Sequence, residues 1–180
     1  MAYITVNETG TFPALILSTD IANLSNTFAT TGNLPADSGV GSLLNVTCLQ
    51  DITITNSTGI FSWTDFCSAS INKVTTPSDN EISTNIVIQD EDFFGDSSAN
   101  NSSALGYGVS GLSQNRVEVA FRIQLNNSSN VGANTPGSTF FYCGRGYLSS
   151  VAPTVSPDSP VWVSPLTLAV TGDMGSGPKV

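Results

Sequence analysis

Apolar and polar residues alternate through segment 116–125, as is typical of a strand with one buried face. The apolar positions are Val117, Val119, Phe121, Ile123 and Leu125. The intervening positions are Arg116, Glu118, Arg122 and Gln124, with Ala120 among them. The pattern predicts a strand that buries the first set and exposes the second.

Two more long segments have strand character, 138–151 and 161–171. Shorter runs with the same period are 44–49, 52–55, 66–74, 82–89, 139–142 and 166–170. Gly, Pro and Asn-Ser clusters separate these runs, which favours a mainly β (α+β) fold with antiparallel sheets in a β-sandwich or barrel-like arrangement.

One helix is predicted over 97–112, because Leu105, Val109 and Leu112 recur at helical spacing. Asp96, Ser97 or Ser98 is expected to cap it. Three glycines within the segment weaken the helix by up to about 1 kcal/mol each relative to Ala.

Three segments have loop composition: a long one over 25–42, a polar one over 126–137 and a Pro-rich one over 152–160. Residues 1–172 are predicted to form a single domain. Residues 173–180 are Gly-rich and are predicted to form a flexible C-terminal arm, either a disordered end or an arm ordered by a neighbouring subunit.

The charge balance argues against binding to nucleic acid. The chain has 14 acidic and 5 basic residues and a formal net charge of −9. Binding to nucleic acid needs clusters of Lys and Arg that displace counterions, and none occurs. Charged residues are only 11% of the chain, against about 25% in ordinary soluble domains. A surface so poor in charge is less protected against self-association.

The residue inventory leaves little room for catalysis. The chain has no histidine, so the usual nucleophilic triads and His-ligated metals are excluded. Its cysteines, Cys48, Cys67 and Cys143, lack CxxC spacing; buried thiols in a reducing compartment are favoured over one disulfide and a spare thiol. We expect no enzyme activity, metal or cofactor.

The N-terminus lacks a signal-peptide pattern and no segment is apolar enough to span a membrane, so a cytoplasmic protein is expected.

Two groups of residues are candidates for contacts. The acidic turn around Asp90, Glu91 and Asp92 fits a solvated turn better than a calcium or paired-carboxylate site. The aromatic residues are interpreted as core or interface anchors in preference to a stacking platform for sugars or bases. These are Trp63, Trp162, Phe61, Phe93, Phe94, Phe140 and Phe141. Arg145, between two glycines, is expected to pair with a carboxylate across an interface or to bond backbone carbonyls.

The second half of the chain resembles the tail tube proteins of long-tailed bacteriophages and their contractile-tail and type VI secretion relatives. The resemblance rests on the order strand, helix, strand, strand, strand over 82–171, on the Arg-x-x-x-x-x-Arg-Ile pattern of 116–123, and on the segment Phe140-Phe-Tyr-Cys-Gly-Arg-Gly-Tyr-Leu-Ser-Ser-Val151. The N-terminal half matches only in general, as a strand-rich segment with a long loop.

The resemblance implies a β-sandwich flanked by a helix, in subunits that form stacked, hexameric rings around a channel for DNA. Implied partners are other copies of the chain and the tape measure, tail terminator and distal tail proteins, with DNA passing without specific binding and no membrane. The implied location is the virion tail, assembled in the host cytoplasm. Loop 25–42 and the C-terminal arm would join rings.

Under this interpretation, the candidate lumen-facing or ring-contact carboxylates are Asp65, Asp79, Glu81, Asp90, Glu91 and Asp92. The candidate interface residues are Arg145, Arg122, Trp63 and Trp162. Two alternatives stay open: a capsid decoration or cement protein, and a carbohydrate-binding β-sandwich that uses its exposed tryptophans.

Overall fold

The computed structural model describes residues 14–35, 43–46, 48–64, 71–88, 93–124, 140–156 and 159–178. Its strands are β1 (Ala14–Ser18), β2 (Leu43–Val46), β3 (Leu49–Trp63), β4 (Asn72–Val87), β5 (Glu118–Gln124), β6 (Phe140–Val151), β7 (Thr154–Ser156) and β8 (Ser159–Pro178). Its helices are the 3₁₀ turn η1 (Ile21–Asn23), α1 (Phe28–Thr31) and α2 (Ala104–Gln114).

All strands belong to one antiparallel sheet of eight strands, in the order β2-β1-β5-β6-β8-β4-β3 with β7 paired to β8. The predicted mainly β fold with a flanking helix is confirmed, and the sheet does not close into a barrel. The predicted strand 116–125 corresponds to β5, and 138–151 to β6. The run 44–49 was expected as a short strand, and β2 covers its first residues. The run 52–55 was also expected as a short strand, but it is part of β3, which continues for 15 residues.

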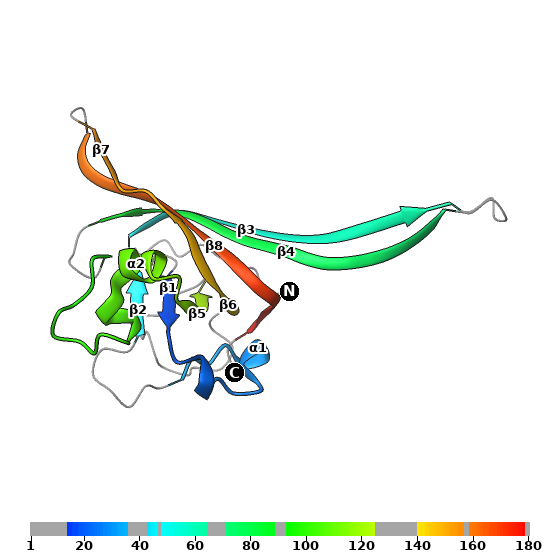
Figure 1. The fold of residues 1–180 in the computed structure, drawn as a ribbon, viewed down its shortest axis with the longest axis horizontal. Coiled ribbons are helices and arrows are strands. Elements are labelled where there is room, and N and C mark those ends of the chain that lie inside the picture. Colours follow the sequence, from blue (N-terminus) through cyan, green and yellow to red (C-terminus); the bar gives the residue numbers. More distant parts are fainter. Residues whose placement is uncertain are drawn as a thin grey trace.

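The main core lies between α2 and the sheet (Figure 1). Val109 and Leu112 of α2 are buried, so the predicted apolar face of the helix is confirmed. On β5, Val119, Phe121 and Ile123 are fully buried in the same core. Burying a side chain of this size contributes about 1.5–3 kcal/mol, so this layer holds the sheet and helix together.

The helix begins later than its sequence predicts. Ser103 caps it, since its hydroxyl oxygen accepts a hydrogen bond of 3.1 Å from the Gly106 N–H. Asp96 was expected near the cap, but its carboxylate accepts bonds from Ser98 in the preceding turn. Gly108 has φ 63° and interrupts the helical backbone, which only glycine does without strain.

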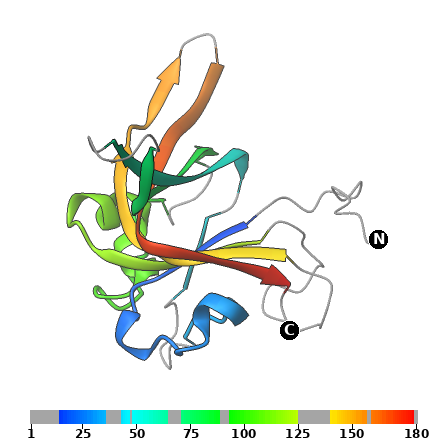
Figure 2. The ribbon, with the colours of Figure 1, turned by 90° about the vertical axis from the view of Figure 1, so that its right-hand side faces the viewer.

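The other face of β5 is also buried, which corrects the prediction that it faces solvent. Ala120, Arg122 and Gln124 are 0%, 6% and 4% exposed. The segment around α1 covers this face, and Phe28 packs there with Ala120, Phe141 and Cys143 (Figure 2). Part of the predicted loop 25–42 is therefore a folded cover; residues 36–42 lie outside the described residues.

The predicted flexibility of the C-terminal residues is wrong for 173–178, which continue strand β8. Residues 175–178 pair with the start of β6. Glycine serves close packing here. A Cβ at Gly175 would collide with the carbonyl oxygen of Ala29 in α1. The predicted loop 152–160 contains β7 and the start of β8, which form a projecting hairpin (Figure 1); loop 126–137 lies outside the described residues.

Within the described residues, no helix has the length and apolar character required to cross a bilayer.

Gly175→Ala is expected to destabilise the fold by about 1–3 kcal/mol, the usual effect of overpacking, because the backbone of α1 must move away from β8. Urea denaturation measures the change in the free energy of unfolding. Ser176→Ala, at the exposed neighbouring position, is the control and is expected to change little. Equal midpoints for the two variants would contradict the close packing.

Candidate self-association surface

The most distinctive feature of the molecule is a two-stranded extension that we call the arm, residues 56–63 of β3 and 72–79 of β4. The two strands pair with each other as far as Trp63 and Asn72. Strand β8 pairs with β4 only over Asn80–Val87. Beyond that point the hairpin projects away from the body (Figure 1).

Asn80 fixes the point where the arm leaves the sheet. Its side chain is 3% exposed. Its amide nitrogen donates to the carbonyl oxygen of Gly172 in β8 at 3.4 Å, and its amide oxygen accepts from the Ser57 N–H in β3 at 3.3 Å. Gly172 has φ 79°, a conformation that lets β8 turn away there. One buried amide thus bridges the three strands that meet at the base of the arm.

The arm contains a β-bulge near its middle. The register shifts between Thr58 and Ile60, so that Gly59 lies opposite an extra residue of β4. Gly59 is required because a Cβ there would collide with the Thr76 side chain. Pro77 adjoins the bulge on β4 and removes one N–H from that edge, and such devices limit uncontrolled strand pairing.

The outer part of the arm carries large apolar side chains in solvent. Phe61 and Trp63 are 58% and 43% exposed, and their rings stack with centroids 5.9 Å apart. The other exposed apolar residues there are Ile60, Ile71 and Val74. An isolated hairpin of two strands is marginally stable in water, and contiguous exposed apolar surface marks interaction sites. We infer that the arm is a contact surface.

The predicted carboxylates that the structure describes lie near the base of the arm. Asp79 and Glu81 are exposed on β4, while Asn80 and Ile82, which alternate with them, are buried. Across the sheet, the Glu81 position is in register with Thr55, Ala169 and Tyr147. Asp65, Asp90, Glu91 and Asp92 lie outside the described residues. The solvated face of the sheet at this level therefore presents Thr55, Glu81, Ala169 and Tyr147.

The two tryptophans lie on different projections. Trp162 is 50% exposed in the part of β8 that pairs with β7, and its carbonyl oxygen accepts from the Ile88 N–H, whereas Trp63 is at the end of β3 in the arm. Phe93 and Phe141 are buried. The aromatic side chains that the structure describes thus do not form the continuous platform that sugar binding by stacking needs.

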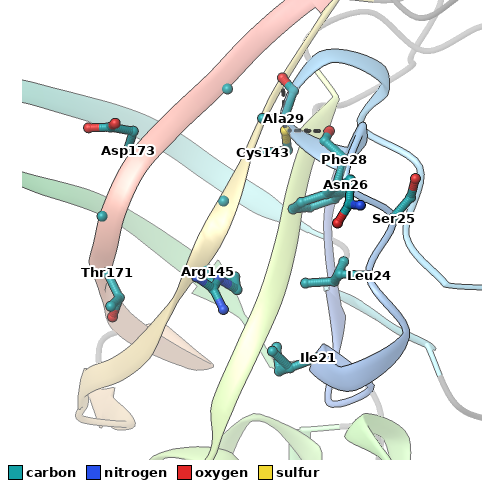
Figure 3. A pocket seen from close by; sticks show the side chains of 13 residues that line it. Ile21, Leu24, Ser25, Asn26, Phe28, Ala29, Cys143, Arg145, Thr171 and Asp173 are labelled. Carbon is teal, nitrogen blue, oxygen red and sulfur yellow. Dashed lines mark hydrogen bonds between the residues drawn. The ribbon is translucent and has the colours of Figure 1, made fainter.

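A groove of about 390 Å³ lies between the α1 segment and the strands β6 and β8 (Figure 3). Ile21, Leu24 and Phe28 line one side, and Arg145 and Asp173 line the other. Arg145 is exposed while Gly144 and Gly146 beside it are buried. A Cβ at Gly144 would collide with the Phe121 ring, and one at Gly146 with the backbone of Ala169. The two glycines allow close packing of strand β6. Arg145, which lies between them, is the charged residue that β6 contributes to the groove.

Two polar groups are buried beneath the α1 segment. Arg122, predicted as an interface residue, donates from Nη1 to the Gly32 carbonyl oxygen at 3.0 Å, and its Nε has no partner among the described residues. Burial lowers the pKa of Arg122. The Cys143 thiol donates to the Phe28 carbonyl oxygen at 3.3 Å. Arg122 therefore holds the subunit's own cover in place, which corrects its assignment to a surface.

Burial raises the pKa of Cys143 to about 11, opposed by a backbone hydrogen bond from Gly175 and by the positive charge of Arg122. Cys143 is a buried free thiol, as predicted from the sequence for this cysteine. Cys67 lies outside the described residues. The buried, hydrogen-bonded thiol is suited to packing and not to nucleophilic chemistry.

Among the described residues, no group of three or more Cys, Asp or Glu residues is placed to hold a metal ion. Hydrogen bonds from the Ser98 side chain and backbone lower the pKa of Asp96. This arrangement stabilises a turn before α2.

The sequence contains a signal for the arm that is visible once the structure is known. Ile60 and Phe61 are adjacent, so consecutive apolar residues point to opposite faces of a strand. Such a pair inside a polar, Thr-rich strand indicates two apolar surfaces where ordinary alternation gives one.

No protein-family model matches this chain, and no curated protein matches it in sequence. Solved structures match it in fold. The tail of an empty gene transfer agent (GTA) particle, refined with C6 helical symmetry, gives a TM-score of 0.51 at 11% identity over 79% of this chain and 92% of that chain. The sheath–tube complex of an extracellular contractile injection system, PVC, gives 0.51 at 14% identity over 86% and 99%.

The SPP1 tail tube gives a TM-score of 0.49 at 10% identity over 93% of this chain and 77% of that chain. The first two comparisons confirm the predicted resemblance to tail tube proteins at the level of the fold. The chain shares its fold with the GTA particle tail and PVC sheath–tube structures.

Cys143 gives a pH-dependent prediction. Because its pKa is about 11 in the folded state against an ordinary value of 9.0, the folded protein holds this proton more tightly than the unfolded chain does. The stabilising contribution is therefore complete below pH 9 and is lost as the pH rises through 11. The urea midpoint of the native protein is expected to fall more steeply over this range than that of Cys143→Ala. Parallel pH profiles would contradict the assignment.

Proposed function

We propose that this chain is a structural subunit that assembles with copies of itself into stacked rings, forming a tail tube through which DNA passes. The observation that carries the proposal is the arm, an apolar hairpin that the rest of its own subunit leaves uncovered. The tail-tube fold supports it, because the similar structures are parts of a particle tail and of a sheath–tube complex. The C6 symmetry of the particle tail favours rings of six subunits.

The arm suits assembly from identical subunits. A projecting element on one side of a molecule makes a heterologous contact, in which it meets a different surface of the next copy. A heterologous contact generates a ring when the rotation closes and a filament when it does not. A tube of stacked rings needs one contact of each kind. The open edges of the sheet, β2 and β3, supply further surface for pairing between subunits.

The solvated face of the sheet suits a channel for DNA. It carries Asp79 and Glu81 and small polar residues, and the net charge of the chain is −9. Carboxylates repel the phosphates of DNA, and a lumen with few cations has no cluster at which DNA is held. We propose that Asp79 and Glu81 face the lumen or the ring contact.

Within this proposal the chain is a virion component, assembled in the host cytoplasm. Tape measure, tail terminator and distal tail proteins are its partners at the ends and inside the tube. A non-enzymatic role agrees with the lack of histidine. The fold comparisons favour this role over a decoration protein, because the similar structures are parts of a particle tail and of a sheath–tube complex.

Sedimentation velocity over a concentration series tests the proposal. The native chain is expected to form assemblies above a critical concentration. Phe61→Ser is expected to raise that concentration about tenfold or more, since an anchor residue of an interface contributes about 2 kcal/mol and each 1.4 kcal/mol is a factor of ten.

Phe94→Ser is the matched control, because Phe94 is 67% exposed on the body of the subunit. It should leave the critical concentration near that of the native chain. A native chain that stays a single subunit at every concentration would contradict the proposal, and equal effects of the two substitutions would contradict the role of the arm.

A further inference from the structure

The end of the arm has two different apolar faces. Side chains of directly opposed residues in an antiparallel pair lie on the same face. Phe61 is opposite Val74 and Trp63 is opposite Asn72, so Phe61, Trp63 and Val74 form one surface, the aromatic face. Ser62 is opposite Lys73 and Ile60 is opposite Thr75. Ile60 and Lys73 therefore share the other surface, and Ile71 follows by alternation; we call this the lysine face.

Both faces are exposed to a similar degree. On the aromatic face, Phe61 and Val74 are 58% and 49% exposed. On the lysine face, Ile60 and Ile71 are 62% and 63% exposed. Nearer the body, β4 behaves differently, since Asn80, Ile82, Thr84 and Ile86 are buried and the residues between them are not. The hairpin thus changes from one apolar side at its base to two at its end.

A strand with two apolar sides is stable when it is covered on both. Laying the arm along a single neighbouring surface would cover one face and leave the other in water. The described part of the subunit's own body does not supply a cover, because the arm extends away from it (Figure 1). Each face therefore needs its own cover from outside the subunit.

Charge identifies the covering molecules. Lys73 is the first basic residue in the sequence, and the next is Arg116. It stands at the end of the arm of a chain with net charge −9. An isolated cation among exposed isoleucines is complementary to an acidic surface with apolar patches, and the body of another copy is such a surface.

We infer that the end of the arm lies between two further copies of this chain, one on the aromatic face and one on the lysine face. This inference rests on the proposed function and specifies how its contacts are arranged. Each arm then links three subunits. When one copy covers the aromatic face, the lysine face is held beside the second copy, so the two contacts form cooperatively. Closure of one ring is therefore coupled to stacking on the next ring.

Two single-tryptophan proteins test the inference, since the chain has two tryptophans. Trp162→Phe leaves Trp63 as the reporter on the aromatic face. Adding Trp63→Phe and Ile60→Trp moves the reporter to the lysine face. Acrylamide quenching of fluorescence is measured for each protein as subunits below the critical concentration and as pelleted assemblies. Quenching of both reporters is expected to fall several-fold on assembly.

Serine variants provide a second measurement that does not depend on the bulk of an added tryptophan. Trp63→Ser and Ile60→Ser are each expected to raise the critical concentration, whereas Phe94→Ser is not. A reporter that stays as accessible in the assembly as in the subunit would overturn the inference, and so would an Ile60→Ser protein that assembles at the native concentration. Both results leave the proposed function standing, because the native chain assembles. A native chain that never assembles removes the proposed function itself.

Discussion

The architecture depends on how strand β4 is held over Asn80–Val87. There it pairs with β3 on one side and β8 on the other, so its backbone groups are satisfied in the interior of a sheet. Past Asn80, β8 turns away and only β3 accompanies β4. The buried Asn80 amide joins the three strands at this branch. A rigid base of this kind allows a hairpin with little stability of its own to extend in a fixed direction.

The body of the subunit is built to support that base. Phe121 and its neighbours fill the core under α2, while Phe28 and the α1 segment cover the opposite face of β5. Glycines on β6 and β8 bring the backbones close enough for both layers to pack. Strand β5 is thus buried on both of its faces, between the two layers.

Strong alternation made part of this fold predictable from sequence. β5, β6 and the buried face of α2 follow from the spacing of apolar residues, and the tail-tube resemblance follows from their order. The length of β3 was missed because Asn56-Ser-Thr-Gly59 has the composition of a turn, whereas a bulge lets the strand pass through it. The end of β8 was missed for a similar reason: composition does not distinguish a glycine that is flexible from one that packs against a helix. Arg122 was placed at an interface because nothing in the sequence indicates that the α1 segment folds over it.

The central claim is that an uncovered apolar arm makes this chain a tube subunit. Negative-stain electron microscopy of the purified native protein tests it most directly. The account predicts hollow tubes or stacked rings with a regular axial repeat and a central channel. Uniform single subunits, or small closed oligomers that never stack, would contradict it.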